Sequence, residues 1–219
     1  MSSENSTVLK HLQEHRYFLP GGDVYFLAEN QLFRVHRYFF QRESRVFQRG
    51  FQSGPRNGET ESTAIILDVS PASFEKLLDV FYNERYSVYN WSIEDWTTVI
   101  KLAQKWEFPE VLELAIRELS RIDMSLIRRI AIYQHLNIDR SHLLPMYAEL
   151  CRRPQALTLQ ESKVIGLETT VLIANVRERL RAPPANGGMS PLPVGIEDDD
   201  VKAAVIEYLG TSAPHAVDL

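Results

Sequence analysis

Residues 23–37, DVYFLAENQLFRVHR, decide the fold of this chain. Apolar side chains lie on both sides of the polar pair Glu29-Asn30. Two short apolar runs joined by a polar pair are typical of a β-hairpin, because the pair forms the turn between the strands. The sequence therefore predicts two antiparallel strands, at 23–28 and 31–36.

The segment after the hairpin predicts two short helices, a loop and a third strand. Apolar residues between 38 and 51 lie three and four positions apart, which is helical spacing, and Ser44 is placed to cap the second helix. Residues 53–63 contain the turn-forming pairs Gly54-Pro55 and Asn57-Gly58 and almost no apolar side chain, which favours a loop. The apolar run 64–67 then predicts a short strand.

Helix signals dominate from Ser70 onward. Ser70-Pro71 and Ser92 are helix N-cap signals, and Pro109 suits a first helical position. Further helices are predicted at 125–136, 140–150, 158–166 and 167–181. Strands interleaved with helices early in the chain, followed by helices alone, predict an α+β domain with an α-helical extension.

The composition changes after residue 181. Residues 182–195 are rich in proline and glycine, as in a linker. Residues 182–219 hold six acidic side chains against one basic side chain, Lys202, so this tail carries a net charge of −5. The aspartates at its centre suit a helix N-terminus, which predicts a short acidic amphipathic helix at 198–209 in a tail that is otherwise largely disordered.

Charge and composition exclude several classes of partner. The whole net charge of −5 lies in the tail, and a neutral body argues against nucleic acid, which needs cationic contacts to phosphate. No stretch approaches the roughly 20 apolar residues of a membrane span, and no secretory signal is visible. A single cysteine, Cys151, precludes an intrachain disulfide. We expect a cytoplasmic or nuclear protein with no membrane contact.

One short motif suggests metal chemistry. His11, Glu14 and His15 match the pattern H-x-x-E-H, in which two histidines on one helix face bind zinc and glutamate is the general base. Only three positions are fixed, and the motif runs directly into the strand-like segment 17–19. A zinc metallohydrolase is therefore the alternative that we do not favour. We expect no catalytic residue, no metal site and no cofactor.

Several of these segments, taken in order, resemble BTB/POZ domains. Residues 23–37 are similar to the family's opening, in which an aspartate leads the first strand and a histidine–basic pair follows the hairpin. Residues 42–47 resemble the next motif, with a serine before an apolar residue and a phenylalanine. Residues 65–82 resemble the family's third strand and following helix.

The resemblance extends beyond this domain. Residues 102–106 and 157–167 are similar to BTB-like proteins that are numerous in mushroom-forming fungi. On this basis we expect a BTB/POZ-like domain at 15–122, a helical extension at 123–181 and a linker with an acidic tail at 182–219.

The resemblance implies a protein–protein interaction module, a scaffold or adaptor that forms homodimers or binds other proteins. Some relatives link substrates to cullin-type ubiquitin ligases, and others recruit transcriptional corepressors. Cullin adaptors commonly carry an apolar residue, any residue and then glutamate after the second helix. Here Phe51-Gln52-Ser53 lacks the glutamate, which argues against a cullin partner.

The resemblance also implies candidate site residues. Positions matching Asp23 and Arg37 often form a buried or pocket-lining charge pair in the family. Together with His36, they are expected either to hold the hairpin to the first helix or to line a partner-binding pocket. Phe47 and Phe51 are candidates for a dimer or partner surface, where aromatic residues are enriched.

Overall fold

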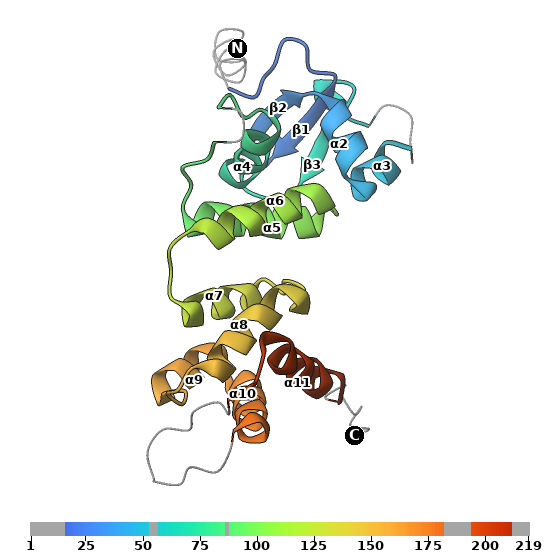
Figure 1. Cartoon of the computed structure of the whole chain (residues 1–219). Helices are drawn as coiled ribbons and strands as arrows, with labels where there is room; N and C mark the ends of the chain where they lie inside the picture. The colour runs from blue at the N-terminus through green and yellow to red at the C-terminus, as the bar shows by residue number, and fades with distance from the viewer. Residues whose placement is uncertain (1–15, 53–56, 86–87, 182–193, 212–219) are drawn as a thin grey trace, which may run out of the picture. The chain divides into compact units, whose positions relative to one another are not determined.

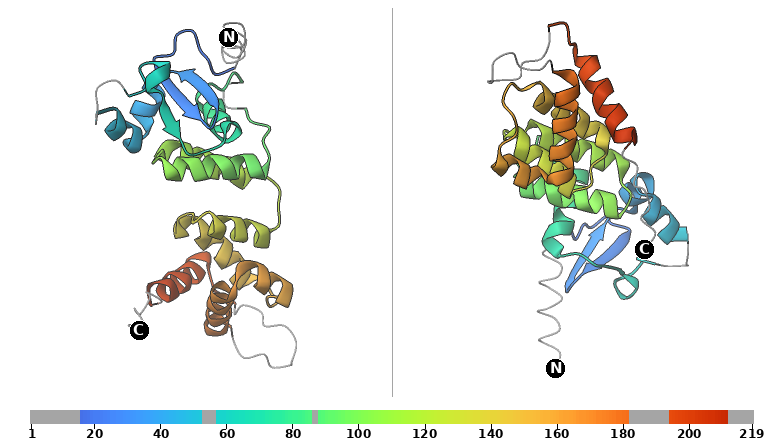
Figure 2. Two further views of the ribbon diagram at one scale, coloured as in Figure 1. Left: turned by 180° about the vertical axis from the view of Figure 1, so that it is seen from behind. Right: turned by 90° about the horizontal axis from the view of Figure 1, so that it is seen from below.

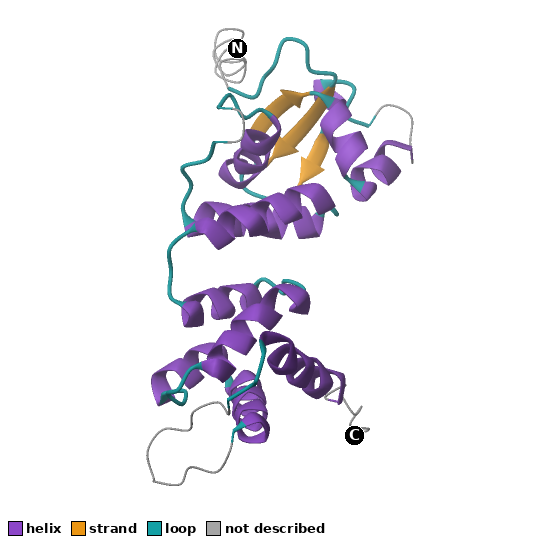
Figure 3. Ribbon diagram, in the orientation of Figure 1, coloured by secondary structure: helices purple, strands orange, loops and turns teal. Residues whose placement is uncertain are grey.

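The computed structural model describes residues 16–52, 57–85, 88–181 and 194–211. The chain divides into two compact units, unit 1 (Met1–Ile122) and unit 2 (Asp123–Leu219). Among the described residues, unit 1 combines a sheet with helices, and unit 2 consists of helices and their connections (Figure 1, Figure 3). The predicted α+β class with a helical extension is confirmed.

The sheet of unit 1 has three strands in the order β2-β1-β3. These are β1 (Val24–Ala28), β2 (Gln31–Val35) and β3 (Ile65–Leu67). The strand β1 pairs antiparallel with β2, so that Phe26 lies opposite Phe33, and parallel with β3. The predicted hairpin and third strand are therefore confirmed, with the hairpin strands shorter than predicted by one residue at each outer end.

Two of the longer helices of unit 1 begin directly after the serines that the sequence places as caps. The described helical segments of unit 1 are α2 (Arg37–Glu43), α3 (Arg45–Gln52), the 3-10 turn η1 (Glu61–Thr63), α4 (Pro71–Phe81), α5 (Ile93–Lys105) and α6 (Pro109–Arg121). The hydroxyl of Ser70 accepts the Ser73 N–H at the start of α4. Ser92 and Asp95 form a reciprocal capping box at the start of α5. Figure 2 shows α5 and α6 packed side by side.

The predicted loop at 53–63 is partly ordered. Residues 61–63 form η1, because the side chains of Thr60 and Thr63 cap it reciprocally. Gly58 joins this turn to the sheet: its carbonyl accepts the Tyr25 N–H at 2.7 Å. Gly58 has a φ of +76°, and a Cβ there would lie 2.8 Å from a methyl of Val24. Only glycine fits this position without displacing the strand.

An aromatic cluster holds the sheet of unit 1 to its helices. Phe26 on β1 packs against Phe40 of α2 at 4.7 Å and Phe74 of α4 at 5.3 Å between ring centroids. Phe33 of β2 meets Phe74 edge-on at 4.9 Å. Phe108 packs against Phe40 from the start of α6. All five rings are completely buried. Tilted and edge-to-face contacts at these distances add to the gain from burying apolar area.

Ser44 is the buried polar residue that connects two parts of this core. It is fully buried, and its hydroxyl accepts the Phe47 N–H at 3.1 Å and donates to the carbonyl of Trp106. The first contact caps α3, as the sequence predicts. The second ties α3 to the end of α5.

Replacing Ser44 tests how much this connection contributes. Ser44→Ala leaves a buried N–H and a buried carbonyl without their partner, so we expect the free energy of unfolding to fall by about 2 kcal/mol. Ser70→Ala removes an exposed helix cap and is expected to cost about 1 kcal/mol. Urea denaturation measures both. A Ser44→Ala loss no larger than that of Ser70→Ala would contradict the assigned role.

The described helices of unit 2 pack as a separate unit. They are α7 (Leu126–His135), α8 (Arg140–Arg152), α9 (Leu159–Ile165), α10 (Leu167–Leu180) and α11 (Asp198–Thr211). The first four agree closely with the predicted helices. The amphipathic helix predicted at 198–209 is confirmed as α11. Because α11 packs against α8 and α10, the expected disorder of the tail does not extend to residues 198–211.

Two arginines close the C-terminal end of α8. Arg177 and Arg181 are each 9% exposed, and their guanidinium groups donate to backbone carbonyls at residues 150–154. These are the carbonyls that a helix end leaves without intrahelical partners. Cys151 lies beside them, fully buried, and burial raises the pKa of its thiol to about 11 despite the two cations. A reactive thiolate is therefore disfavoured at Cys151.

The start of α9 holds a carboxylate that titrates far from its usual range. Glu161 accepts both Nη groups of Arg153, at 2.6 and 2.9 Å, and the N–H of Thr158 at 2.7 Å. The Arg153 contact, followed by the Thr158 N–H, lowers the pKa of Glu161 from 4.5 to about 2. In the folded state Glu161 therefore stays ionised at pH values at which the same carboxyl is already protonated in the unfolded chain.

The stability of the chain should depend on this group in acid. Because the folded pKa is depressed, the stabilisation is fully present above pH 4.5 and is lost as the pH falls towards about 2. Glu161→Gln should therefore flatten the acid limb of stability against pH, measured by urea midpoints between pH 2 and 6. Glu168→Gln, at an exposed position on α10, should keep the wild-type slope. Equal slopes in all three proteins would contradict the assignment.

Candidate protein-interaction surface

The exposed side of α2 presents an aromatic residue together with an arginine. Tyr38 is 59% exposed. The guanidinium of Arg42, one turn along α2, lies 4.9 Å from the Tyr38 ring centroid, and one Nη donates to the Tyr38 hydroxyl at 3.1 Å. Arg42 also lies 5.9 Å from the ring of Phe39 and forms an ion pair with Glu43. We refer to Tyr38, Phe39 and Arg42 as the α2 face.

The α2 face is anchored from beneath. Phe39 is half-buried and stacks parallel on Phe81 of α4, with centroids 5.4 Å apart. Tyr38 packs edge-on against Phe39 at 5.7 Å. Tyr38 is therefore held between a fixed ring and the Arg42 guanidinium. A side chain already held in place loses less conformational entropy when a partner binds.

Asp23 and Arg37 meet in a way that differs from the expected charge pair. The Asp23 carboxylate accepts the backbone N–H of Arg37 at 2.6 Å, which satisfies a free donor in the first turn of α2. The Arg37 guanidinium instead lies over the ring of Phe51, 4.5 Å from its centroid, and reaches the Asn57 carbonyl at 3.5 Å. Asp23 thus caps α2, and Arg37 packs the end of α3.

His36 joins the hairpin to α4. Its backbone N–H donates to the Tyr82 hydroxyl at 2.9 Å, and its Nδ1 lies 2.9 Å from the same oxygen. Asp23 and Arg37 join the start of the hairpin to α2, whereas His36 contacts the end of α4, and the role of these three residues as a site stays a prediction. The partner of His36 on α4, Tyr82, was not predicted as a site residue.

Phe47 and Phe51 lie in different environments. Phe47 is 6% exposed and packs on Phe26, Phe40 and Trp106 inside the aromatic cluster. That position leaves very little of its ring for a partner to contact. Phe51 is half-buried at the end of α3, where Arg37 covers one face of its ring. Of these two candidates, Phe51 is the one that a partner can reach.

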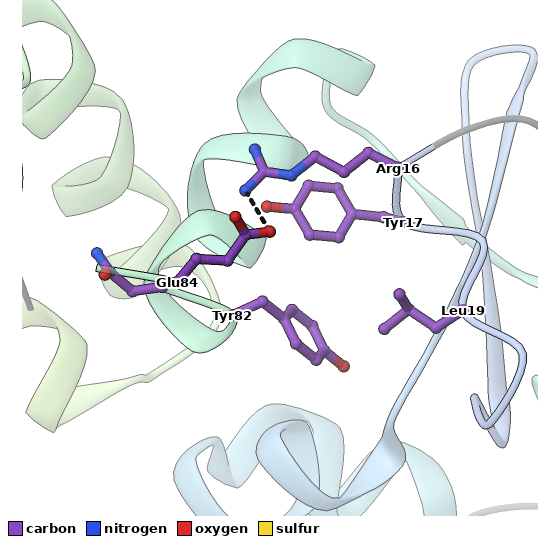
Figure 4. A pocket seen from close by; sticks show the side chains of 6 residues that line it. Arg16, Tyr17, Leu19, Tyr82 and Glu84 are labelled. Carbon is purple, nitrogen blue, oxygen red and sulfur yellow. Dashed lines mark ion pairs between the residues drawn. The ribbon is translucent and has the colours of Figure 1, made fainter. Parts of the chain in front are cut away.

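A shallow recess of about 390 Å³ lies between the segment before β1 and the end of α4 (Figure 4). It is lined by Arg16, Tyr17, Leu19, Tyr82, Asn83 and Glu84. Arg16 pairs with Asp79 at 2.8 Å and lies 3.8 Å from Glu84. Its lining therefore combines the ion-paired Arg16 with the rings of Tyr17 and Tyr82.

Sequence reasoning missed this recess, although the strand-like segment 17–19 pointed to one of its walls. That segment pairs with the outer edge of β2. The Leu19 N–H donates to the Arg34 carbonyl at 2.8 Å, and the Arg34 N–H donates to the Tyr17 carbonyl at 2.9 Å. The Tyr17 hydroxyl bonds to Asp79 on α4. Burial and this carboxylate raise the pKa of Tyr17. The second wall follows α4, far along the sequence.

The comparisons agree with this fold. The BTB/POZ domain family model matches residues 11–122, which is half of the chain, and the chain belongs to that family. The BTB/POZ domain is a protein–protein interaction and oligomerisation module. No curated protein matches this chain.

The residues of the zinc-binding pattern, His11, Glu14 and His15, lie outside the described residues. Within them, no group of three or more histidine, cysteine or acidic side chains is arranged to hold a metal ion. No helix in the described part of the chain is long and apolar enough to cross a membrane.

Removing the Asp23 carboxylate tests its structural role. Asp23→Ala leaves the Arg37 N–H at the start of α2 without its acceptor, and we expect the free energy of unfolding to fall by about 1 kcal/mol. Glu59→Ala removes a carboxylate from an exposed position on the neighbouring turn and should change stability by less than about 0.5 kcal/mol. Thermal denaturation compares them. If the two variants lose equal stability, Asp23 does not cap α2.

Proposed function

We propose that this chain is a scaffold or adaptor that acts through homo- or hetero-oligomerisation. In this proposal the α2 face is the main surface that contacts the partner. Residues 15–122 form the interaction domain, and the helical extension at 123–181 binds the protein that is to be recruited. The resemblance to BTB-like proteins of mushroom-forming fungi continues into unit 2, and we propose that the chain belongs to that lineage.

The observation that carries the proposal is the exposed pair Tyr38 and Arg42. Tyrosine and arginine are among the residue types most enriched at the positions that contribute most of the binding free energy of protein interfaces. Tyr38 exposes 59% of its surface, whereas the neighbouring rings of α2 are half or fully buried. Arg42 adds a cation beside the exposed ring. A second copy of the chain could pack its own α2 face here, as a two-fold interface requires.

A cullin-type ubiquitin ligase scaffold is the heteromeric partner to test first, and transcriptional corepressors are the alternative. Phe51 lies at the end of α3, where adaptors commonly present an apolar residue followed by glutamate two positions later. Gln52 is exposed there, and the sequence continues with Ser53 instead of glutamate. We therefore expect homodimerisation to be stronger than cullin binding.

The proposal predicts that one substitution on α2 separates the dimer. Tyr38→Asp places a charge where two α2 faces would meet, and we expect the dimer dissociation constant to rise at least about tenfold, because a central aromatic residue contributes about 2 kcal/mol or more. Light scattering of the full chain over a concentration series measures this. Val88→Asp adds the same charge at a 63% exposed apolar position outside α2 and should leave the mass unchanged.

The same experiment with a purified cullin N-terminal domain distinguishes the versions of the function. A dimer that Tyr38→Asp weakens supports the α2 face as the contact. A stable dimer whose dissociation constant is unchanged by Tyr38→Asp contradicts the assignment of the α2 face as the dimer contact. A chain that stays monomeric and does not bind the cullin domain contradicts both the proposed homodimer and the proposed binding to a cullin.

A further inference from the structure

The segment before β1 lies at an edge of the sheet of unit 1. Its central residue, Phe18, forms a parallel bridge with Arg34 of β2, and the two hydrogen bonds of this bridge involve Tyr17 and Leu19. Successive residues of an extended chain direct their backbone groups to opposite sides, so the N–H and carbonyl of Phe18 point away from β2. Among the described residues, none bonds to either group. This edge of the sheet therefore presents an unpaired donor and an unpaired acceptor.

The side chains of this segment also alternate between two sides. The ring of Phe18 lies on one face of the sheet, where it meets Tyr25 edge-on at 6.3 Å between centroids. Tyr17 and Leu19 lie on the other side and line the recess at the end of α4. Leu19 and Tyr82 point toward each other across this recess (Figure 4). The unpaired backbone groups and the recess therefore belong to the same short segment.

One carboxylate that lines the recess is available to a second cation. Arg16 pairs closely with Asp79, at 2.8 Å, whereas its other terminal nitrogen lies 3.8 Å from Glu84. The Glu84 side chain is 83% exposed. A long ion pair in such an exposed position contributes little free energy, because water and salt screen it. A basic side chain of another molecule therefore meets little competition at Glu84.

We propose that this edge binds an extended peptide segment of a partner protein. The segment adds a strand beside Phe18 and bonds to its unpaired N–H and carbonyl. A large apolar side chain of the segment enters the recess between Leu19 and Tyr82. A lysine or arginine two positions away, on the same side of the segment, meets Glu84. Addition of a strand to an open sheet edge is a common mode of peptide recognition, in which backbone bonds give affinity and pockets for alternate side chains give specificity.

The observations favour an extended chain over a helix as the occupant. A helix uses its backbone groups in its own hydrogen bonds and leaves the Phe18 pair without partners. The contact is also short. Pro20 follows the edge, and the Gly22 N–H bonds to the Leu19 carbonyl at 3.0 Å, so the chain turns away after Leu19. The site goes beyond the proposed function, because it uses neither Tyr38 nor Arg42 of the α2 face.

The test measures binding of a fluorescent peptide to the full chain by anisotropy. The peptide alternates threonine and valine, and near its centre a phenylalanine and a lysine flank one threonine. We expect this peptide to bind the wild-type chain. N-methylation of the flanked threonine removes the donor to the Phe18 carbonyl and should weaken binding at least about tenfold. The matched control is N-methylation of the lysine, whose N–H points away from the edge, and this peptide should bind as the parent does.

Substitution of Phe18 tests the other backbone bond. Phe18→Pro removes the ring and the N–H, whereas Phe18→Ala removes the ring and keeps the N–H. Proline is tolerated at a sheet edge where its nitrogen has no partner. We expect Phe18→Pro to bind the peptide at least about fivefold more weakly than Phe18→Ala. Thermal denaturation checks that both variants are equally folded.

Charge reversal tests the assigned contact at Glu84. Glu84→Lys should weaken binding about fivefold, and a peptide with glutamate in place of its lysine should regain the lost affinity on this variant. Glu59→Lys makes the same charge change at an exposed position outside the recess and should bind the parent peptide as the wild-type chain does.

The outcomes separate this site from the α2 face. Weaker binding of the peptide with the methylated threonine, together with the charge-reversal rescue, supports the proposal. Absence of peptide binding to the wild-type chain, or equal binding of the two methylated peptides, overturns it. If Phe18→Pro is less stable than Phe18→Ala, the methylated peptides decide. Tyr38→Asp should leave peptide binding unchanged, so this proposal and the α2-face dimer stand or fall separately.

Discussion

The packing of Phe26 against Phe40, Phe47 and Phe74 is the contact on which the rest of unit 1 depends. Their ring centroids lie 4.7 to 5.5 Å from Phe26, and these rings come from β1, α2, α3 and α4. Because each helix contributes a ring to the same cluster, the sheet fixes where every helix of this group can lie. The exposed side of α2 is defined by that constraint: Phe40 faces inward to the cluster, and Tyr38 is left facing solvent.

Local signals in the sequence were sufficient to predict most of the elements. Ser70, Ser92 and Thr158 each cap a helix as their residue types indicate, and the polar pair Glu29-Asn30 forms the hairpin turn. The exceptions depend on contacts between distant residues. Gly58, beside the η1 turn that was not predicted, pairs with β1. The helix α11 was predicted, but its packing on α8 and α10 was not. Neither partner can be read from the segment itself.

The candidate site was less predictable than the fold. The family resemblance pointed to Asp23, His36 and Arg37, and all three lie at the junction of the hairpin with the helices. Residue type alone could not show that the Asp23 carboxylate accepts the backbone N–H of Arg37, or that the Arg37 guanidinium covers the ring of Phe51. Nor could it rank Tyr38 above Phe47, because which aromatic ring faces solvent depends on how the helices settle on the sheet.

The hydrogen bond from Ser44 to the Trp106 carbonyl joins residues 62 positions apart, and Phe108 completes the same cluster. Contacts between distant residues form slowly, because a long loop must close before they give any stabilisation. During synthesis the hairpin, α2 and α3 therefore emerge with their aromatic rings still unburied. They must wait until α5 and Phe108 have left the ribosome. A chaperone that binds exposed aromatic segments would find its target in residues 26–51 during that interval.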